Sequence, residues 1–253
     1  MTDLNGRHAV VTGGGSGIGL AIARALAEAG AAVTITGRRE AALRDAAAAT
    51  PGLHPLVMDV TDEASVVDGF AAAVAARGPV SICVANAGIA EGRNLAKMDL
   101  AFWRKILSTN LDGAFLTLRE AMKSMHDQDW GRVIAVSSIA GVRGLKGAPA
   151  YTASKHGVIG LIRGLSEDYM RSPITFNAIC PGYVDTDIVT RNTAEISARA
   201  GLSEDEARQT MIRANRHKRL IDADEIAAAA LWLCDPRSGS VNGQCIEISG
   251  GQT

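Results

Sequence analysis

A phenol and an ammonium group that can carry proton chemistry stand four residues apart, at Tyr151 and Lys155. If this stretch is helical, the two side chains lie on one face, one turn apart. A cation beside a tyrosine hydroxyl favours the phenolate and so lowers a pKa that is ordinarily about 10. The pair therefore predicts a proton donor or acceptor that works near neutral pH. Taken alone, the pentapeptide also fits a helix with a half-buried tyrosine and a lysine that extends into solvent.

A glycine-rich turn near the start of the chain has the arrangement of a phosphate-binding site. A β-branched run at 8–12 predicts a buried strand, glycines crowd residues 13–19, and apolar residues recur at helical spacing over 20–30. This order aims backbone N–H groups and a helix N-terminus at a phosphate, although a glycine turn without a ligand is the alternative. The common pattern G-x-G-x-x-G fails, because Leu20 stands where its last glycine would be. The pattern T-G-x-x-x-G-x-G fits instead, with Thr12, Gly13, Gly17 and Gly19.

The end of the second predicted strand, residues 32–36, indicates which nucleotide the turn would bind. In an NAD site this position usually holds an Asp or Glu that binds the ribose 2′-hydroxyl, whereas here Gly37 is followed by Arg38 and Arg39. The missing carboxylate removes a repulsion against a 2′-phosphate, and a guanidinium can bind that phosphate with two hydrogen bonds. These residues favour NADP(H), and NAD(H) stays open because Glu40 can partly neutralise the arginines.

Strands alternate with helices along the chain, which predicts one α/β domain over residues 1–253, with about seven strands in a doubly wound parallel sheet. The further strands are expected at 56–58, 80–85, 131–137, 174–180 and 243–248. The further helices are expected at 39–49, at 61–76 with Thr61 as N-cap, at 99–126, at 150–170, and at 223–233 opened by Asp222 or Asp224. The polar stretch at about 187–220 has a helical pattern and is expected to be a lid over a pocket.

Two polar residues stand at places where a structural role alone is less expected. Asn110 falls inside the longest predicted helix, where an amide side chain is a poor helix former. It indicates a kink or a bound water, and a core amide with all its hydrogen bonds made is the alternative. Asp59 follows a predicted strand, at the edge where an α/β sheet places its ligand contacts, and it can also serve as a loop or capping carboxylate.

The composition excludes several classes of protein. The 253 residues are 47% hydrophobic and 21% charged, which suits one large globular domain or two small ones. With 26 basic and 27 acidic residues the net charge is −1, so no basic excess predicts nucleic-acid binding. No apolar stretch reaches the roughly 18 residues that span a bilayer, and the first residues lack a signal-peptide pattern, so we expect a cytoplasmic protein with no membrane partner.

The four cysteines stand far apart in apolar runs, with no C-x-x-C spacing. We expect buried, reduced thiols rather than disulfides or zinc ligands, and no metal site. The cysteines are Cys83, Cys180, Cys234 and Cys245.

Together these features resemble the short-chain dehydrogenase/reductase family over nearly the whole chain. The elements that match in order and spacing are Thr12–Gly19, Asp59, Asn86–Gly88, Asn110, Ser138, Tyr151 with Lys155, and Pro181-Gly182 with Thr186. Ala85 departs from the family's N-N-A-G element, which has an Asn there. The chain also resembles the 3-oxoacyl reductase and hydroxybutyrate dehydrogenase branches, through the length of the predicted lid and the glycine-rich end of the chain. The resemblance implies a Rossmann-type fold and an NAD(P)-dependent oxidoreductase that interconverts a secondary alcohol and a ketone.

The resemblance also implies a role for each catalytic candidate. Tyr151 would be the general acid in reduction and the base in oxidation, while Lys155 would lower its pKa and bind the nicotinamide ribose. Ser138 would bind the substrate oxygen, and Asn110 would hold a water that links Lys155 to solvent. Hydride transfer leaves an alkoxide, so a site with one proton donor and one oxyanion partner suits the reaction.

The nucleotide would lie along residues from several loops, with the glycine turn at the pyrophosphate, Asp59 at the adenine and Thr186 near the nicotinamide. The full set implied is Gly13, Ser16, Gly17, Ile18, Gly19, Arg38, Asp59, Val60, Asn86, Ala87, Gly88, Tyr151, Lys155, Pro181, Gly182, Val184 and Thr186.

The substrate is less well indicated than the reaction. The pocket would be lined by residues 90–95, 139–149 and the predicted lid. Its basic residues suit an anionic substrate, such as an acyl thioester of CoA or of a carrier protein, although a solvated basic rim fits equally well. These residues are Arg93, Arg143, Lys146, Arg191 and Arg199. A hydroxybutyrate or another small alcohol is the alternative substrate.

The predicted helices at 99–126 and 150–170 carry more apolar surface than one sheet face needs. The family pairs such helices between subunits, so a homotetramer is expected. A regulatory protein that binds a nucleotide without catalysis is the rival class. The complete set of Ser138, Tyr151, Lys155 and Asn110 weighs against it.

Overall fold

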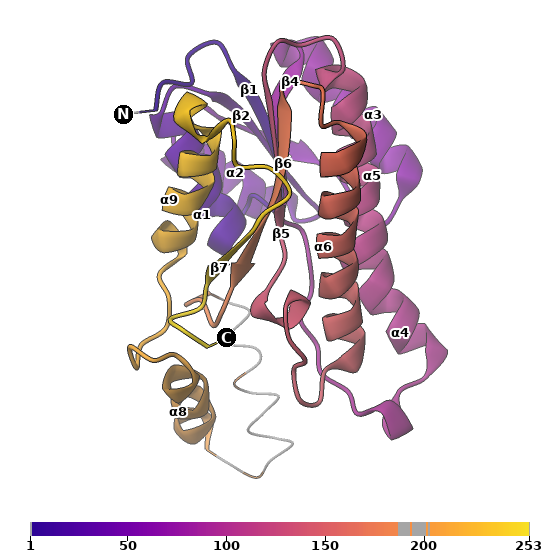
Figure 1. Ribbon diagram of the computed structural model, residues 1–253, viewed down its shortest axis with the longest axis vertical. Helices are drawn as coiled ribbons and strands as arrows, with labels where there is room; N and C mark the ends of the chain where they lie inside the picture. Colours follow the sequence, from indigo (N-terminus) through magenta and orange to yellow (C-terminus); the bar gives the residue numbers. More distant parts are fainter. Residues whose placement is uncertain (1, 187–192, 194–200, 202, 253) are drawn as a thin grey trace.

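The computed structural model describes residues 2–186, 193, 201 and 203–252. Its centre is a seven-stranded parallel sheet in the order β3-β2-β1-β4-β5-β6-β7 (Figure 1). The strands are β1 (His8–Thr12), β2 (Ala32–Gly37), β3 (Leu53–Val57), β4 (Val80–Ala85), β5 (Gly131–Val136), β6 (Ile174–Pro181) and β7 (Cys245–Ile248). The predicted doubly wound sheet and its seven strands are confirmed. The strand order reverses between β1 and β4, and in such sheets a ligand binds at the carboxyl ends beside that point.

Helices cover both faces of the sheet. The described helices are α1 (Gly17–Glu28), α2 (Glu40–Ala49), α3 (Glu63–Arg77), α4 (Leu100–Leu107), α5 (Gly113–Met125), α6 (Pro149–Asp168), α8 (Glu204–Ala214) and α9 (Ala223–Cys234). One core cluster joins the sheet to α1, α2 and α9, and a second joins the other face to α3, α5 and α6. Figure 1 shows α8 apart from both layers, beyond the carboxyl ends of the strands. The four central strands β1, β4, β5 and β6 are buried along their whole length, as is typical of parallel sheets covered on both faces.

Two predicted boundaries in the third strand and the helix after it are wrong. The strand begins at Leu53 and runs through Pro55, which pairs with Ile35 of β2. A proline is tolerated there because β3 is the edge strand, so its missing N–H costs no ladder bond. The N-cap of α3 is Asp62 rather than Thr61, since Asp62 Oδ1 accepts from the backbone N–H of Ala64 at 3.0 Å.

The long helix predicted at 99–126 is interrupted in the middle. Helix α4 ends at Leu107, a π-helical turn spans Ser108–Asp112, and α5 continues from Gly113. Asn110 lies in this turn and is 1% exposed. The single helix is therefore wrong, and the predicted irregularity at Asn110 is confirmed as a widened turn, a feature common at functional sites.

The predicted lid lies partly outside the described residues, which omit 187–192, 194–200 and 202. Within its range, Ser203 opens α8 with a reciprocal capping box to Glu206. Helix α9 begins after Asp222, the first of the two predicted start residues.

Three of the four cysteines are buried, as predicted, whereas Cys245 is partly exposed. All four are free thiols. In the part of the chain that the structure describes, no helix is long and apolar enough to cross a membrane.

Candidate active site

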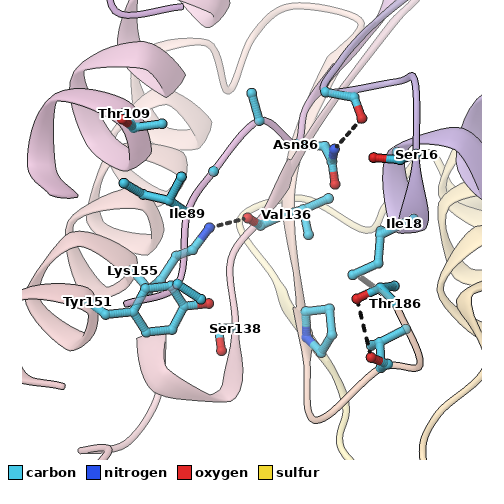
Figure 2. A pocket seen from close by; sticks show the side chains of 18 of the residues that line it. Ser16, Ile18, Asn86, Ile89, Thr109, Val136, Ser138, Tyr151, Lys155 and Thr186 are labelled. Carbon is cyan, nitrogen blue, oxygen red and sulfur yellow. Dashed lines mark hydrogen bonds between the residues drawn. The ribbon is translucent and has the colours of Figure 1, made fainter. Parts of the chain in front are cut away.

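A cavity of about 530 Å³ opens at the carboxyl ends of the strands. It is lined by every residue predicted to bind the nucleotide, and by Ser138, but not by Asn110. We call residues 13–19 with Arg38 and Asp59 the nucleotide end, and Ser138, Tyr151 and Lys155 the reaction end. In Figure 2 Ser16, Ile18 and Thr186 lie across the cavity from the reaction end.

The glycine turn is held by the threonine that begins its pattern. Thr12 Oγ1 accepts from the backbone N–H of Asn86 at 3.0 Å, and Asn86 Nδ2 donates back to Thr12 O at 2.8 Å. These bonds join the end of β1 to the end of β4. A Cβ on Gly13 would lie 2.9 Å from Asn86 Nδ2, and one on Gly19 would overlap the same atom, so no side chain fits at either position.

The N-terminus of α1 is left open toward the cavity. Ser16 is the N-cap residue, but its hydroxyl does not cap the helix and instead accepts from Arg39 Nη2 at 3.1 Å. The first turn has no acidic residue. Its N–H groups and the helix dipole therefore face the cavity with nothing negative beside them, which suits a pyrophosphate. Gly17 has a φ of 53°, and a Cβ there would approach Thr186 Cγ2 to 3.2 Å across the cavity.

Charged side chains stand at the far corner of the nucleotide end. Arg38 Nη1 lies 3.9 Å from Asp59 Oδ2, and the two side chains are 68% and 35% exposed. Partial burial opposes ionisation of Asp59, but hydrogen bonds from Thr61 and the charge of Arg38 hold the pKa of its carboxyl below the usual value. Glu40, expected to neutralise the arginines, instead accepts from Arg44.

An unpaired polar atom on the cavity wall also favours a bound nucleotide. Thr36 Oγ1 lies on the wall of the nucleotide end, where it is buried without a hydrogen-bond partner among the described residues. Buried hydroxyls rarely lack a partner, so this atom favours a polar ligand in the cavity. With the open helix end and the Arg38 guanidinium, the residues present fit a dinucleotide.

The reaction end is carried by α6 and by the residue that follows β5. Tyr151 and Lys155 lie one turn apart on α6, and Ser138 faces the phenol (Figure 2). Lys155 is 5% exposed, and its Nζ donates to Val136 O at 2.9 Å. Ser137 Oγ donates to Lys155 O at 3.0 Å, which ties α6 to the end of β5.

Burial shifts the pKa of both groups on α6. It raises the pKa of Tyr151, and the hydrogen bond with Ser138 opposes that rise. It also lowers the pKa of Lys155 to about 8. The expected lowering of the Tyr151 pKa is thus wrong. The physical reason is that Lys155 Nζ points at Val136 O and lies 5.9 Å from the centre of the tyrosine ring.

Asn110 acts through the backbone of the neighbouring loop. Its Oδ1 accepts from Ile89 N at 2.8 Å, and its Nδ2 donates to Ile89 O at 2.9 Å and to Ser154 Oγ at 3.1 Å. These are the bonds of a satisfied core amide. Asn110 Oδ1 and Lys155 Nζ nevertheless both border Gly88, where a Cβ would approach them to 3.2 and 3.5 Å.

The basic residues predicted around the substrate are not gathered together. Lys146 lines the cavity, whereas Arg143 donates to Gln252 Oε1 at 2.9 Å. Arg93 does not line it, because its guanidinium stacks on Phe102 at 4.1 Å and lies 3.8 Å from Asp99. Arg191 and Arg199 lie outside the described residues.

Sequence reasoning missed Tyr183, a second phenol on the cavity wall. Burial raises its pKa, and the charge of Arg143 opposes that rise. Its only signal in the sequence is its place after the turn at Pro181 and Gly182. Among the described residues no three His, Cys, Asp or Glu side chains gather in a group that could hold a metal ion.

Comparison with known proteins adds an independent observation. A family model described as short chain dehydrogenase matches residues 7–197. The cis-4-hydroxycyclohexanecarboxylate dehydrogenase of Sinomonas cyclohexanicum is 39% identical over 98% of this chain and 96% of its own length. An acetoacetyl-CoA reductase of Shinella zoogloeoides is 34% identical over 97% of this chain and 98% of its own. A crystal structure of actinorhodin polyketide ketoreductase with NADPH superposes with a TM-score of 0.95 at 31% identity, covering 100% of this chain and 99% of the other.

Proposed function

This chain belongs to the short-chain dehydrogenase/reductase family, and from that membership we propose which of its residues perform the reaction. It is an NAD(P)-dependent oxidoreductase that interconverts a secondary alcohol and a ketone. The observation that supports the residue roles is the placement of two hydroxyls, Tyr151 and Ser138, at one point of the cavity with a buried lysine beside them.

Bound NAD(P)H supplies the hydride. As hydride reaches the carbonyl carbon, negative charge develops on the oxygen, and Ser138 and Tyr151 both donate hydrogen bonds to it. Tyr151 then gives its proton to the alkoxide and completes the alcohol. In the reverse direction the Tyr151 phenolate takes the hydroxyl proton. The raised pKa of Tyr151 keeps the phenol protonated near neutral pH, as reduction needs.

We assign to Lys155 the positive charge that stabilises the Tyr151 phenolate. With a pKa of about 8 it is mostly protonated at pH 7, and its Nζ is within 5.9 Å of the tyrosine ring. An ammonium there stabilises the phenolate that proton donation leaves. We assign to Lys155 the ribose contact as well, and to Asn110 the water through which the proton is replaced; the nearness of Asn110 Oδ1 to Lys155 Nζ around Gly88 supports this.

We propose that the nucleotide is NADP(H) by preference. Support comes from Arg38 and Arg39 at the end of β2, from the absence of a carboxylate at Gly37, and from the use of Glu40 by Arg44. The glycine turn would bind the pyrophosphate, Asp59 and Val60 would lie at the adenine, and Thr186 near the nicotinamide.

The substrate class is a ketone with an anionic group. Lys146 on the cavity wall supports this, as do two relatives, one named for a hydroxycyclohexanecarboxylate and one for acetoacetyl-CoA. A 3-oxoacyl thioester and a small carboxylate-bearing alcohol are the two forms of this class.

A panel of ketones tests the function. NADPH absorbance is followed with acetoacetyl-CoA, with 4-oxocyclohexanecarboxylate and with uncharged ketones of similar size. We expect consumption of NADPH with at least one anionic ketone and faster turnover than with NADH. A chain that binds NADPH but consumes it with no ketone would be a nucleotide-binding regulator instead.

We further propose a cytoplasmic homotetramer, with the predicted segment at 187–220 as a lid. Phe115 of α5 is 45% exposed and borders an apolar hollow with Leu161 and Leu165 of α6. An exposed apolar patch of this kind supports an interface between subunits. Light scattering checks the assembly, and a monomer would contradict it.

A further inference from the structure

Gln252, next to the end of the chain, joins three segments that are far apart in sequence. Its Oε1 accepts a hydrogen bond from Arg143 Nη2 at 2.9 Å, and its Nε2 donates to Asn215 Oδ1. The same Nε2 lies against Gly182, where an added Cβ would approach it to 3.2 Å. We call Arg143, Gly182, Asn215 and Gln252 the C-terminal bridge.

Two segments of the C-terminal bridge border the cavity. Arg143 lies in the loop between Ser138 and Tyr151, and residues 145–148 of that loop line the cavity. Gly182 lines the cavity directly. The bridge therefore links two parts of the cavity wall to the end of α8.

The third segment is the end of α8. Asn215 follows its last residue, is 0% exposed, and uses its Nδ2 to donate to Arg219 O at 2.6 Å. Its Oδ1 is the atom that Gln252 satisfies. Without Gln252, this buried acceptor would lose its partner, which disfavours the observed position of α8.

The turn after α8 is closely fitted to the end of the chain. Arg216 N donates to Gly250 O at 2.9 Å, and a Cβ on Gly250 would lie 2.8 Å from His217 Nε2. Lys218 has a φ of 54°, the one non-glycine residue in the left-handed region among the described residues. Strain of this kind persists where the surroundings hold it, and here Lys218 N donates to Asn215 O at 2.9 Å.

Arg143 depends on Gln252 for its position. It is an exposed residue, and no carboxylate of the described residues lies within ion-pair distance of it. The amide oxygen of Gln252 is its hydrogen-bond acceptor. The amide thus holds a loop cation on one side and the end of a helix on the other.

We propose that Gln252 is a positioning residue, which joins α8 to the loop at 139–149 and so sets the width of the entrance through which the ketone reaches Tyr151. The part that concerns the ketone rests on the proposed function. The part that concerns α8 and the loop does not.

Gln252→Ala tests the proposal, with Gln244→Ala as the matched control. Gln244 lies in the same C-terminal stretch, is exposed, and its side chain donates to Asn242 O, two residues away. We expect Gln252→Ala to raise KM for the ketone about tenfold, as the loss of a hydrogen bond to a charged group predicts, while kcat and the Kd for NADPH change less than about twofold. An unchanged KM, or an equal loss in kcat and nucleotide affinity, overturns the proposal.

Hydrogen exchange separates this test from the reaction itself. In Gln252→Ala, without any substrate, the amides of α8 and of residues 139–149 should exchange faster, and in Gln244→Ala they should not. If the exchange rates of both segments are unchanged in Gln252→Ala, the proposed role of Gln252 is wrong. If the wild-type chain reduces no ketone, the proposed function fails and the exchange result alone decides the bridge.

An exchange of the two partners provides a rescue. Arg143→Gln combined with Gln252→Arg places a donor opposite the amide oxygen and keeps a donor toward Asn215 Oδ1. The double variant should recover a KM within about threefold of the wild type, whereas either single variant does not. A double variant as impaired as the single ones rules out the direct contact.

Discussion

The two ends of the cavity bind by different means. At the nucleotide end the groups that face the cavity are backbone N–H groups and exposed charges, with Arg38 68% exposed. At the reaction end they are buried side chains, with Lys155 5% and Ser138 9% exposed. Water screens the first set and is largely excluded from the second. A change at the nucleotide end should therefore alter affinity modestly, and a change at the reaction end should alter the chemistry strongly.

The largest expected effect is at Tyr151. Tyr151→Phe keeps the ring and removes the proton, so kcat should fall about 10²- to 10⁴-fold while NADPH binding is retained. Tyr183→Phe is the matched control, because Tyr183 is a second phenol of the same cavity with a pKa raised by burial. It should lose less than about tenfold. Steady-state kinetics and fluorescence titration with NADPH measure both quantities. Equal losses in the two variants would remove the distinction between the phenols.

The next effect is on stability, because the buried ammonium of Lys155 lowers the free energy of unfolding. Burial lowers the pKa of Lys155 to about 8 in the folded chain, whereas a lysine in the unfolded chain has a pKa of about 10.4. Between these two pH values the folded chain binds fewer protons than the unfolded chain. Stability contributed by this group therefore rises with pH across that window. At pH 7 the buried charge costs about 3 kcal/mol, and its hydrogen bond to Val136 O returns about 1 kcal/mol.

Lys155→Met should accordingly be more stable than the wild type by about 2 kcal/mol at pH 7, and the advantage should vanish by about pH 10. Urea unfolding without nucleotide at the two pH values gives the difference. Lys97→Met, at an exposed lysine, is the control for removal of a surface charge. A difference between Lys155→Met and the wild type that does not depend on pH would show that the ammonium is not desolvated.

The smallest effect is at the nucleotide end. Arg38→Ala should raise KM for NADPH about tenfold and leave KM for NADH almost unchanged, because only the 2′-phosphate loses a partner. The loss should shrink as salt is added, since the guanidinium is exposed. Arg44→Ala is the control, because Arg44 lies on the neighbouring helix α2 and is paired with Glu40. Equal effects on both nucleotides would refute the preference for NADP(H).

The same contrast explains what could be predicted from the sequence. The strand, the glycine turn and α1 are contiguous, and a glycine is needed at Gly13 because Asn86 leaves no space for a side chain. Local patterns of this kind are visible in the order of residues. Asn110 was also predictable as an irregularity, because an amide in an apolar helix is a local conflict.

What the sequence did not predict depends on segments that meet only in the fold. Tyr183 and Gln252 follow no motif, and their roles come from the place where β6, α8 and the chain end converge. The direction of the Tyr151 pKa was missed because spacing places Lys155 nearby but does not tell where its Nζ points. Arg93 has the charge of a substrate-binding residue, yet Phe102 and Asp99 hold it away from the cavity.

The measurement that tests the central claim most directly is the transfer of label from the nicotinamide to the substrate. NADPH that carries deuterium at the transferred position is incubated with the ketone that the panel selects, and the alcohol is analysed by mass spectrometry. We predict one deuterium at the carbinol carbon for each NADPH consumed, and formation of the labelled alcohol about 10²- to 10⁴-fold more slowly with Tyr151→Phe. Consumption of NADPH without deuterium in the alcohol would contradict hydride transfer at this site.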